Sequence, residues 1–114
     1  MATTGLDGPY TLSREKIDSV VTRTSPGAYA LGEMKDNTFY ISYVGRSDDD
    51  VNRRLHEWVG KYASFKFGYY PSAKAAYEKE CSLWHDFGGP DGKLDNKSHP
   101  AKTVVSWACP VCGV

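Results

Sequence analysis

The sequence predicts one small α/β domain of the α+β type, in which a three-stranded antiparallel sheet is flanked by helices. Three observations lead to this prediction. The chain has 114 residues, which is enough for one modest hydrophobic core. Two short apolar runs surround a turn at 35–37, as in a β-hairpin. A long run with helical periodicity occupies 72–88 and ends in Gly88-Gly89-Pro90.

The segment before the hairpin has weaker signals. Residues 1–9 show no apolar periodicity and are expected to be a disordered lead-in. A short helix is predicted from Ser13, whose hydroxyl is a suitable N-cap, because apolar residues recur at helical spacing through Val21. Ser25-Pro26-Gly27 then ends it. Residues 1–24 are therefore interpreted as a lead-in and a short helix ahead of the main domain.

The hairpin and the segments after it supply the expected sheet. Strands are predicted near 28–34 and 38–45. The next segment, 47–62, opens with Ser47 and three aspartates, which suit a helix N-terminus, and its apolar residues recur at helical spacing. The aromatic, alternating run 65–70 predicts the third strand.

One residue of the long helix at 72–88 is out of place. The apolar residues of this helix fall on one face, yet Glu80 lies in the middle of that face. A carboxylate there is costly unless it is paired, hydrogen-bonded or bound to a cation. Two interpretations stay open. Glu80 either makes a structural bond, to a buried backbone group or to Arg54, or it binds a metal ion.

Composition limits the class of protein. Fourteen basic residues balance fourteen acidic ones, so no large basic surface for nucleic acid is expected, although a local basic face is compatible with this balance. No apolar run approaches the roughly 20 residues that a membrane helix needs, and no signal-peptide pattern is evident. Three cysteines suit a reducing compartment better than a disulfide framework. The expectation is a soluble cytoplasmic protein with no membrane partner.

Several short motifs, in this order along the chain, resemble the GIY-YIG nuclease family. Gly27-Ala28-Tyr29 corresponds to the first motif, with Ala in place of Ile, and Tyr43-Val44-Gly45 corresponds to the second. The resemblance covers about residues 27–97, so the catalytic domain is taken as 25–97 and the tail as 98–114. The later matches are a basic residue, a helix arginine, a helix carboxylate and a late asparagine: Arg46, Arg54, Glu80 and Asn96.

The resemblance implies a metal-dependent endonuclease that hydrolyses the phosphodiester bonds of DNA. In that role Glu80 would bind Mg²⁺ or Mn²⁺, and Arg54 would stabilise charge on the phosphate. One of two tyrosines would orient or deprotonate the attacking water, with Tyr43 favoured and Tyr29 in support. The remaining residues of the implied site are Asn96, in the catalytic set, and Arg46 and Arg53, which would bind the DNA.

Besides the Ala in place of Ile and a hairpin a few residues longer than usual, the pattern departs from the family at two further places. An extra aspartate in 48–50 leaves the register ambiguous between Arg53 and Arg54, and helical phasing together with the following leucine favours Arg54. Trp58 stands where many members have His or Tyr, so a second proton-handling group is missing there. The alternative function is a non-catalytic nucleic-acid or protein binding module on the same fold, which the zero net charge favours.

The tail of the chain raises a separate question, because Cys109-Pro110-Val111-Cys112-Gly113 has the form of a zinc knuckle. The tight turn of a knuckle lets two thiolates face one cation, but two cysteines are only half of a tetrahedral site. The candidates for the other half are Cys81, His85, His99 and a second chain. A reduced dithiol and a redox pair are the alternatives. A purely structural zinc protein is the third functional hypothesis. A further strand is expected at 102–107.

Overall fold

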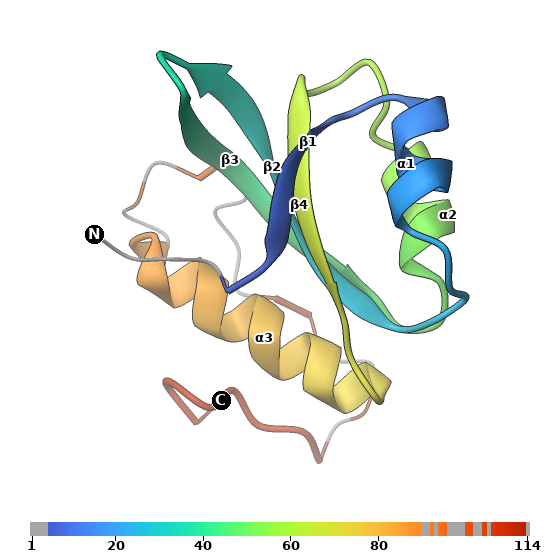
Figure 1. Cartoon of the computed structure of the whole chain (residues 1–114). Coiled ribbons are helices and arrows are strands. Elements are labelled where there is room, and N and C mark those ends of the chain that lie inside the picture. The colour runs from blue at the N-terminus through green and yellow to red at the C-terminus, as the bar shows by residue number, and fades with distance from the viewer. Residues whose placement is uncertain are drawn as a thin grey trace.

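The computed structural model describes residues 5–89, 92, 94, 95, 100, 101, 104 and 106–113. Within this part of the chain, four strands form one antiparallel sheet in the order β1-β4-β2-β3, and three helices cover it (Figure 1). The predicted α+β class is confirmed. The elements are β1 (Asp7–Thr11), α1 (Arg14–Val20), β2 (Gly27–Lys35), β3 (Thr38–Ser47), α2 (Val51–His56), β4 (Ser64–Tyr69) and α3 (Ala73–Asp86).

Strand β1 is the main departure from the prediction. Three strands and a disordered stretch over 1–9 are expected from the sequence. The strand number is wrong, because β1 pairs with β4 as a fourth strand, and the expected disorder is wrong for residues 7–9, which belong to β1. Gly8 and Pro9 conceal this strand, since both residue types are depleted in strands. Pro9 is tolerated because β1 lies at a sheet edge. Tyr10 holds the strand in place by packing on Phe65, with ring centroids 5.6 Å apart.

The β2–β3 hairpin forms as predicted. Its turn contains Asp36 and Asn37 at positive φ, 52° and 66°, a conformation that Asp and Asn adopt more readily than most residues. The pairing of the strands sets Tyr29 opposite Gly45. A Cβ at Gly45 would stand 2.5 Å from the hydroxyl oxygen of Tyr29, so the ring can lie across β3 only because this residue is glycine. The two motifs of the hairpin are therefore complementary in shape.

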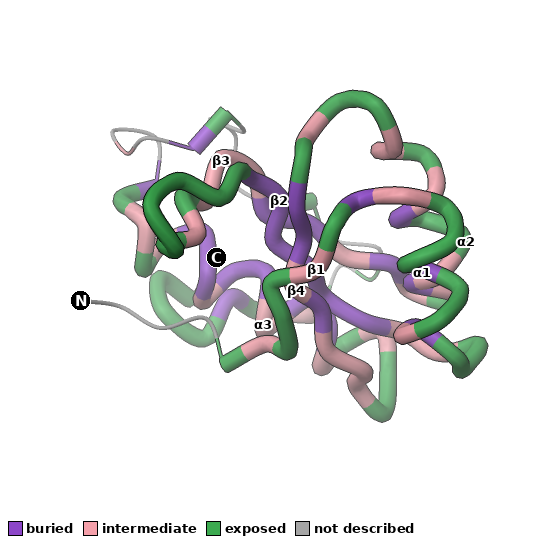
Figure 2. The backbone as a smooth tube through the Cα atoms, turned by 45° about the horizontal axis from the view of Figure 1, so that its top comes forward, coloured by how far each residue is buried: buried purple, intermediate pink, exposed green. Residues whose placement is uncertain are grey.

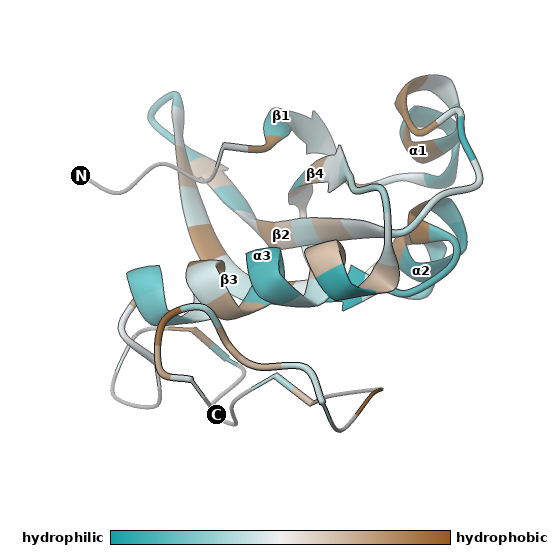
Figure 3. Cartoon of the chain, turned by 90° about the horizontal axis from the view of Figure 1, so that it is seen from below, coloured by the Kyte–Doolittle hydropathy of each residue, from teal (hydrophilic) through white to brown (hydrophobic). Residues whose placement is uncertain are grey.

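Helices cover both faces of the sheet, and each face has its own core (Figures 1 and 3). Successive residues of a strand point to opposite faces. Tyr29 and Leu31 of β2 therefore pack towards α1 and α2, whereas Ala30 packs towards α3 together with Leu83 and Trp84. Burial is continuous along the first six residues of β2, which runs through the middle of the molecule (Figure 2).

The helices differ in how closely they follow the prediction. Ser13 and Ser72 cap α1 and α3, each by accepting a hydrogen bond from the main-chain N–H three residues later. Helix α2, in contrast, ends at His56 instead of continuing to 62. Gly60, at a φ of 90°, lies in the turn that follows and takes the chain away from the helix axis. The apolar residues after His56 are therefore not on a helix.

The tail returns to α3 after the long helix ends (Figure 3). The described residues of 102–107 form no strand, so in that part the strand prediction is wrong. Trp107 packs on Tyr77 of α3, with ring centroids 5.6 Å apart. Cys109 is buried in the same small cluster, next to Cys81. Side-chain packing thus holds the tail against the helix.

Candidate active site and metal-binding group

A cavity of about 450 Å³ lies at the outer edge of β3, between α2 and α3. Tyr43 and Gly45 point towards α2, and Arg46, which follows them, points towards α3, so the cavity reaches around the edge of the sheet. Asn96, also expected in the site, lies outside the described residues. Six of the residues that the sequence predicts for the site line the cavity: Tyr29, Tyr43, Arg46, Arg53, Arg54 and Glu80.

Glu80 of α3 is buried and forms an ion pair with Arg46 of β3. Glu80 is 8% exposed, and its Oε1 accepts a hydrogen bond of 2.7 Å from Nη1 of Arg46. Arg46 also donates through Nε to Asp48, at 2.8 Å, and through Nη2 to the carbonyl oxygen of Ala101, at 2.6 Å. The structural partner of Glu80 is therefore Arg46, and not Arg54 or a backbone group as the sequence suggests. Burial raises the pKa of Glu80, and the bond to Arg46 opposes that rise.

We expect Arg46→Met to lower the free energy of unfolding by roughly 2–4 kcal/mol near neutral pH, because it leaves the Glu80 charge buried without its partner. Since the folded-state pKa of Glu80 is raised, its contribution to stability is greatest at low pH and is lost as the pH rises through that pKa. Losing Arg46 raises the pKa further. The deficit of the variant should therefore be large at about pH 7 and small at about pH 4.

Urea denaturation of both proteins at the two pH values tests this expectation. Arg53→Met is the matched control, because its ion pair with Asp49 is exposed, with side chains 64% and 67% accessible. Such pairs contribute little to stability, so the control should unfold like the wild type. An equal deficit of Arg46→Met at both pH values would show that the ionisation of Glu80 is not responsible.

Tyr29 is buried, and two donors surround its hydroxyl. Nε1 of Trp58 donates a hydrogen bond of 2.8 Å to this oxygen, and the guanidinium of Arg54 lies beside it. Burial raises the pKa of Tyr29 to about 12 in spite of the nearby Arg54. Tyr29 is therefore protonated at neutral pH and acts as a fixed polar group. From the sequence, Trp58 is noted only because it replaces a His or Tyr that could handle protons. The structure shows that it holds the hydroxyl of Tyr29.

Tyr43 lies further towards solvent and packs against Trp58 at a tilt, with ring centroids 4.5 Å apart. Burial is the main cause that raises the pKa of Tyr43; the negative charge of Glu80 adds to the rise and Arg54 opposes it. The ionisation of Tyr43 thus depends on the charge at Glu80. A cation beside Glu80 would offset that charge and lower the pKa of Tyr43.

Arg53 and Arg54 both line the cavity but have different surroundings. Arg54 lies beside Tyr29 and pairs with Glu57 at 3.2 Å. Arg53 pairs with Asp49 at 2.9 Å, at the end of the cavity that is open to solvent. Both ion pairs are exposed and therefore weak, so a phosphate group can compete for either arginine. Arg54 is the one that reaches the tyrosines.

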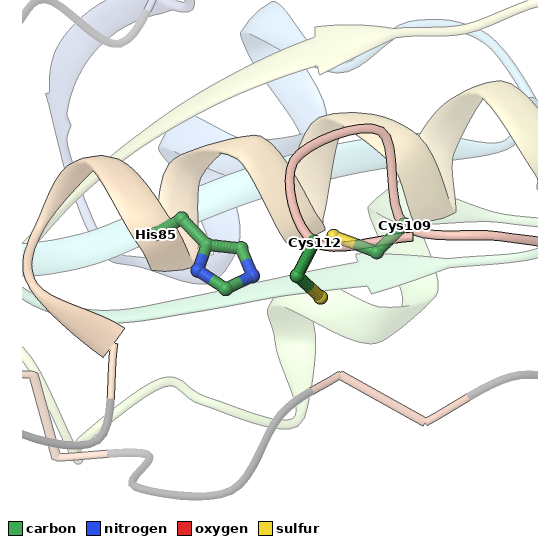
Figure 4. A group of neighbouring side chains, drawn as sticks. All are labelled: His85, Cys109 and Cys112. Carbon is green, nitrogen blue, oxygen red and sulfur yellow. The ribbon is translucent and has the colours of Figure 1, made fainter. Parts of the chain in front are cut away.

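A second group of side chains lies where the tail meets α3. The ligand atoms of His85, Cys109 and Cys112 all lie within 4.8 Å of one another (Figure 4). His85 belongs to the last turn of α3, and the two cysteines belong to the turn near the C-terminus. This group can hold a metal ion such as Zn²⁺. Cys81 lies beside Cys109 but is outside the group of three, and His99 lies outside the described residues.

Comparisons with known proteins give no relative from which a function can be transferred. The chain matches no protein-family model, no curated protein and no solved structure. Within the described residues, none of the helices combines the length and the apolar character needed to span a bilayer. Any functional assignment therefore rests on the motifs of the hairpin and on the geometry of the cavity.

Proposed function

We propose that the protein is an endonuclease of GIY-YIG type that hydrolyses DNA phosphodiester bonds with the help of a divalent cation. One observation carries this proposal. Four side chains from four separate elements meet in one cavity, Tyr29 from β2, Tyr43 from β3, Arg54 from α2 and Glu80 from α3. A purely structural role would not require a buried carboxylate at this place, because burying its charge is costly.

The chemistry of the cavity fits Mg²⁺ or Mn²⁺. Both are hard cations that take carboxylate ligands, and Mg²⁺ keeps several of its waters, so one carboxylate in an open cavity is enough to hold it. The cavity of about 450 Å³ has room for a hydrated ion beside a phosphate group. When bound, such a cation would stabilise the leaving oxygen and polarise the phosphate. Glu80 is the residue that would hold it, after release of its bond to Arg46.

The other residues have roles that follow from their surroundings. Arg54 would exchange its exposed bond with Glu57 for the non-bridging oxygens of the phosphate. Tyr29, held by Trp58, would keep that guanidinium in place. Tyr43 would orient the attacking water, since it is the more accessible tyrosine and its pKa responds to the charge at Glu80.

A second candidate function is a non-catalytic binding module. One observation favours it: in the described part of the cavity each of the three arginines is already paired with a carboxylate. DNA must displace these carboxylates before it can bind, and the chain as a whole has a formal net charge of zero. A protein partner with its own basic residues would meet no such cost.

A cleavage assay separates the two functions. We expect the protein to nick or cut supercoiled, branched or single-stranded DNA when Mg²⁺ or Mn²⁺ is present, and to lose this activity entirely when EDTA is added. Gel electrophoresis of the products provides the measurement. DNA binding without cleavage, under all metal conditions and on all three substrates, would contradict the nuclease proposal and support the binding module.

A further inference from the structure

We propose that His85, Cys109 and Cys112 form a zinc site that fastens the C-terminal tail to α3. This proposal is independent of the nuclease proposal, because none of the three residues lines the cavity at β3. Their ligand atoms lie within 4.8 Å of one another (Figure 4). Ligand atoms on one tetrahedral Zn²⁺ stand roughly 3.5–3.8 Å apart, given Zn–N and Zn–S bonds of about 2.0 and 2.3 Å. Small side-chain rotations would close the three ligands around an ion, and a water molecule would complete its tetrahedral shell.

The turn that carries the cysteines already has the form of a knuckle. The N–H of Gly113 donates a hydrogen bond of 2.8 Å to the carbonyl oxygen of Cys109. Gly113 has a φ of 77°, in the left-handed region that glycine occupies without steric cost. This closed turn holds Cys109 and Cys112 close together beside α3, with both sulfur atoms within 4.8 Å of each other and of a ring nitrogen of His85 (Figure 4). The position of the two thiols therefore follows from the local backbone and needs no metal to create it.

The third ligand comes from α3, a separate element of the chain. His85 lies in the last turn of α3, and its ring packs edge-on against the buried Trp84, with centroids 5.0 Å apart. The last turn of a helix carries partial negative charge, which favours a cation there. Two thiolates and a neutral imidazole also balance the charge of Zn²⁺. The site thus suits a divalent ion electrostatically as well as geometrically.

The chemistry of the donors selects the metal. Thiolate and imidazole ligands favour Zn²⁺, whereas Mg²⁺ and Mn²⁺ prefer oxygen ligands such as Glu80 in the cavity at β3. Together with the cation proposed at Glu80, the protein would hold two kinds of metal at separate places. A zinc ion here would close the loop between α3 and Cys109, and this loop includes Ala101, whose carbonyl oxygen binds Arg46 beside Glu80. The zinc site would thereby support one wall of the cavity at β3, which Ala101 lines.

Elemental analysis of reduced, untagged protein, purified without added metal, tests the proposal. We expect about one zinc per chain in the wild type, because structural zinc sites bind tightly. His85→Ala and Cys112→Ser each remove a ligand and should retain less than about 0.2 equivalents. Two matched controls, His56→Ala and Cys81→Ser, should retain zinc. Wild-type protein with less than about 0.2 equivalents would overturn the proposal, and so would zinc retained by both ligand variants.

Substitution with Co²⁺ gives a second measurement that does not depend on how well a variant folds. The wild-type protein should show the visible spectrum of tetrahedral Co²⁺ with a charge-transfer band of an intensity that corresponds to two thiolates. An intensity corresponding to three thiolates would show that Cys81 is also a ligand and would overturn the proposed ligand set. Loss of zinc from Cys81→Ser would lead to the same conclusion. Absence of a tetrahedral spectrum would contradict the site altogether.

Discussion

Glu80→Gln should abolish metal-dependent cleavage of DNA, with a fall in rate on the order of 10³-fold or more, because the substitution removes the charged ligand of the cation. Glutamine has nearly the same size as glutamate, and its side-chain oxygen can still accept the hydrogen bond from Arg46. Arg46 also keeps its bonds to Asp48 and to the carbonyl oxygen of Ala101. The variant should therefore fold, and the effect should be confined to catalysis.

Glu78→Gln, the same substitution two residues earlier on α3, is the matched control, because Glu78 does not line the cavity. Single-turnover rates on supercoiled plasmid, at saturating protein, measure the chemical step for both variants. The control should cleave at the wild-type rate. A Glu80→Gln rate close to that of the wild type would show that this carboxylate does not hold the cation, and the nuclease proposal would lose its central residue.

The unfolding free energy of the same variant separates the two roles of Glu80. Burial raises the pKa of Glu80, so its charge is costly in the folded protein even beside Arg46. Glutamine removes both the charge and the ion pair, and the two effects oppose each other. We expect the stability of Glu80→Gln to lie within about 1–2 kcal/mol of the wild type. If the variant loses activity but keeps its stability, the role of Glu80 is functional and not structural.

The parts of the fold that the sequence predicts well are those with local signals. The hairpin has a turn at 35–37 that Asp and Asn favour, and α3 has a serine cap at Ser72 and glycines after its end. Strand β1 has no such signal. Its Gly8 and Pro9 argue against a strand, and it becomes one by pairing with β4, where Tyr10 packs on Phe65 and Phe67. Tertiary contacts decide that element, and they cannot be read from periodicity.

The candidate site shows the same division between local and long-range information. The position of Glu80 on an apolar helix face correctly predicts that it is buried and needs a partner. The identity of the partner is not predicted, since Arg46 lies 34 residues away on a different element. Likewise, the knuckle at 109–113 is visible in the sequence, whereas the choice of His85 as its companion depends on where the tail crosses α3.

Arg54→Ala should lower the cleavage rate by about 100-fold or more, the scale of losing one group that stabilises charge in the transition state. The guanidinium of Arg54 lies beside the buried hydroxyl of Tyr29, and within the described residues its carboxylate partner is the exposed Glu57. Tyr29 therefore holds the guanidinium in place, and the weak bond to Glu57 can readily be exchanged for a bond to a phosphate. Truncating a group that acts mainly in the transition state lowers the reaction rate and changes substrate binding little.

Arg53→Ala is the matched control, one residue away on the same helix. Arg53 lies at the exposed rim of the cavity, where it pairs with Asp49, so it can contact a phosphate but not the tyrosines. Its loss should weaken DNA binding modestly and reduce the salt dependence of binding by about one counterion, with almost no change in rate. Binding isotherms at several salt concentrations, together with single-turnover rates, separate the two arginines. If Arg53→Ala loses rate and Arg54→Ala loses only affinity, the extra aspartate in 48–50 shifts the register and Arg53 is the catalytic residue.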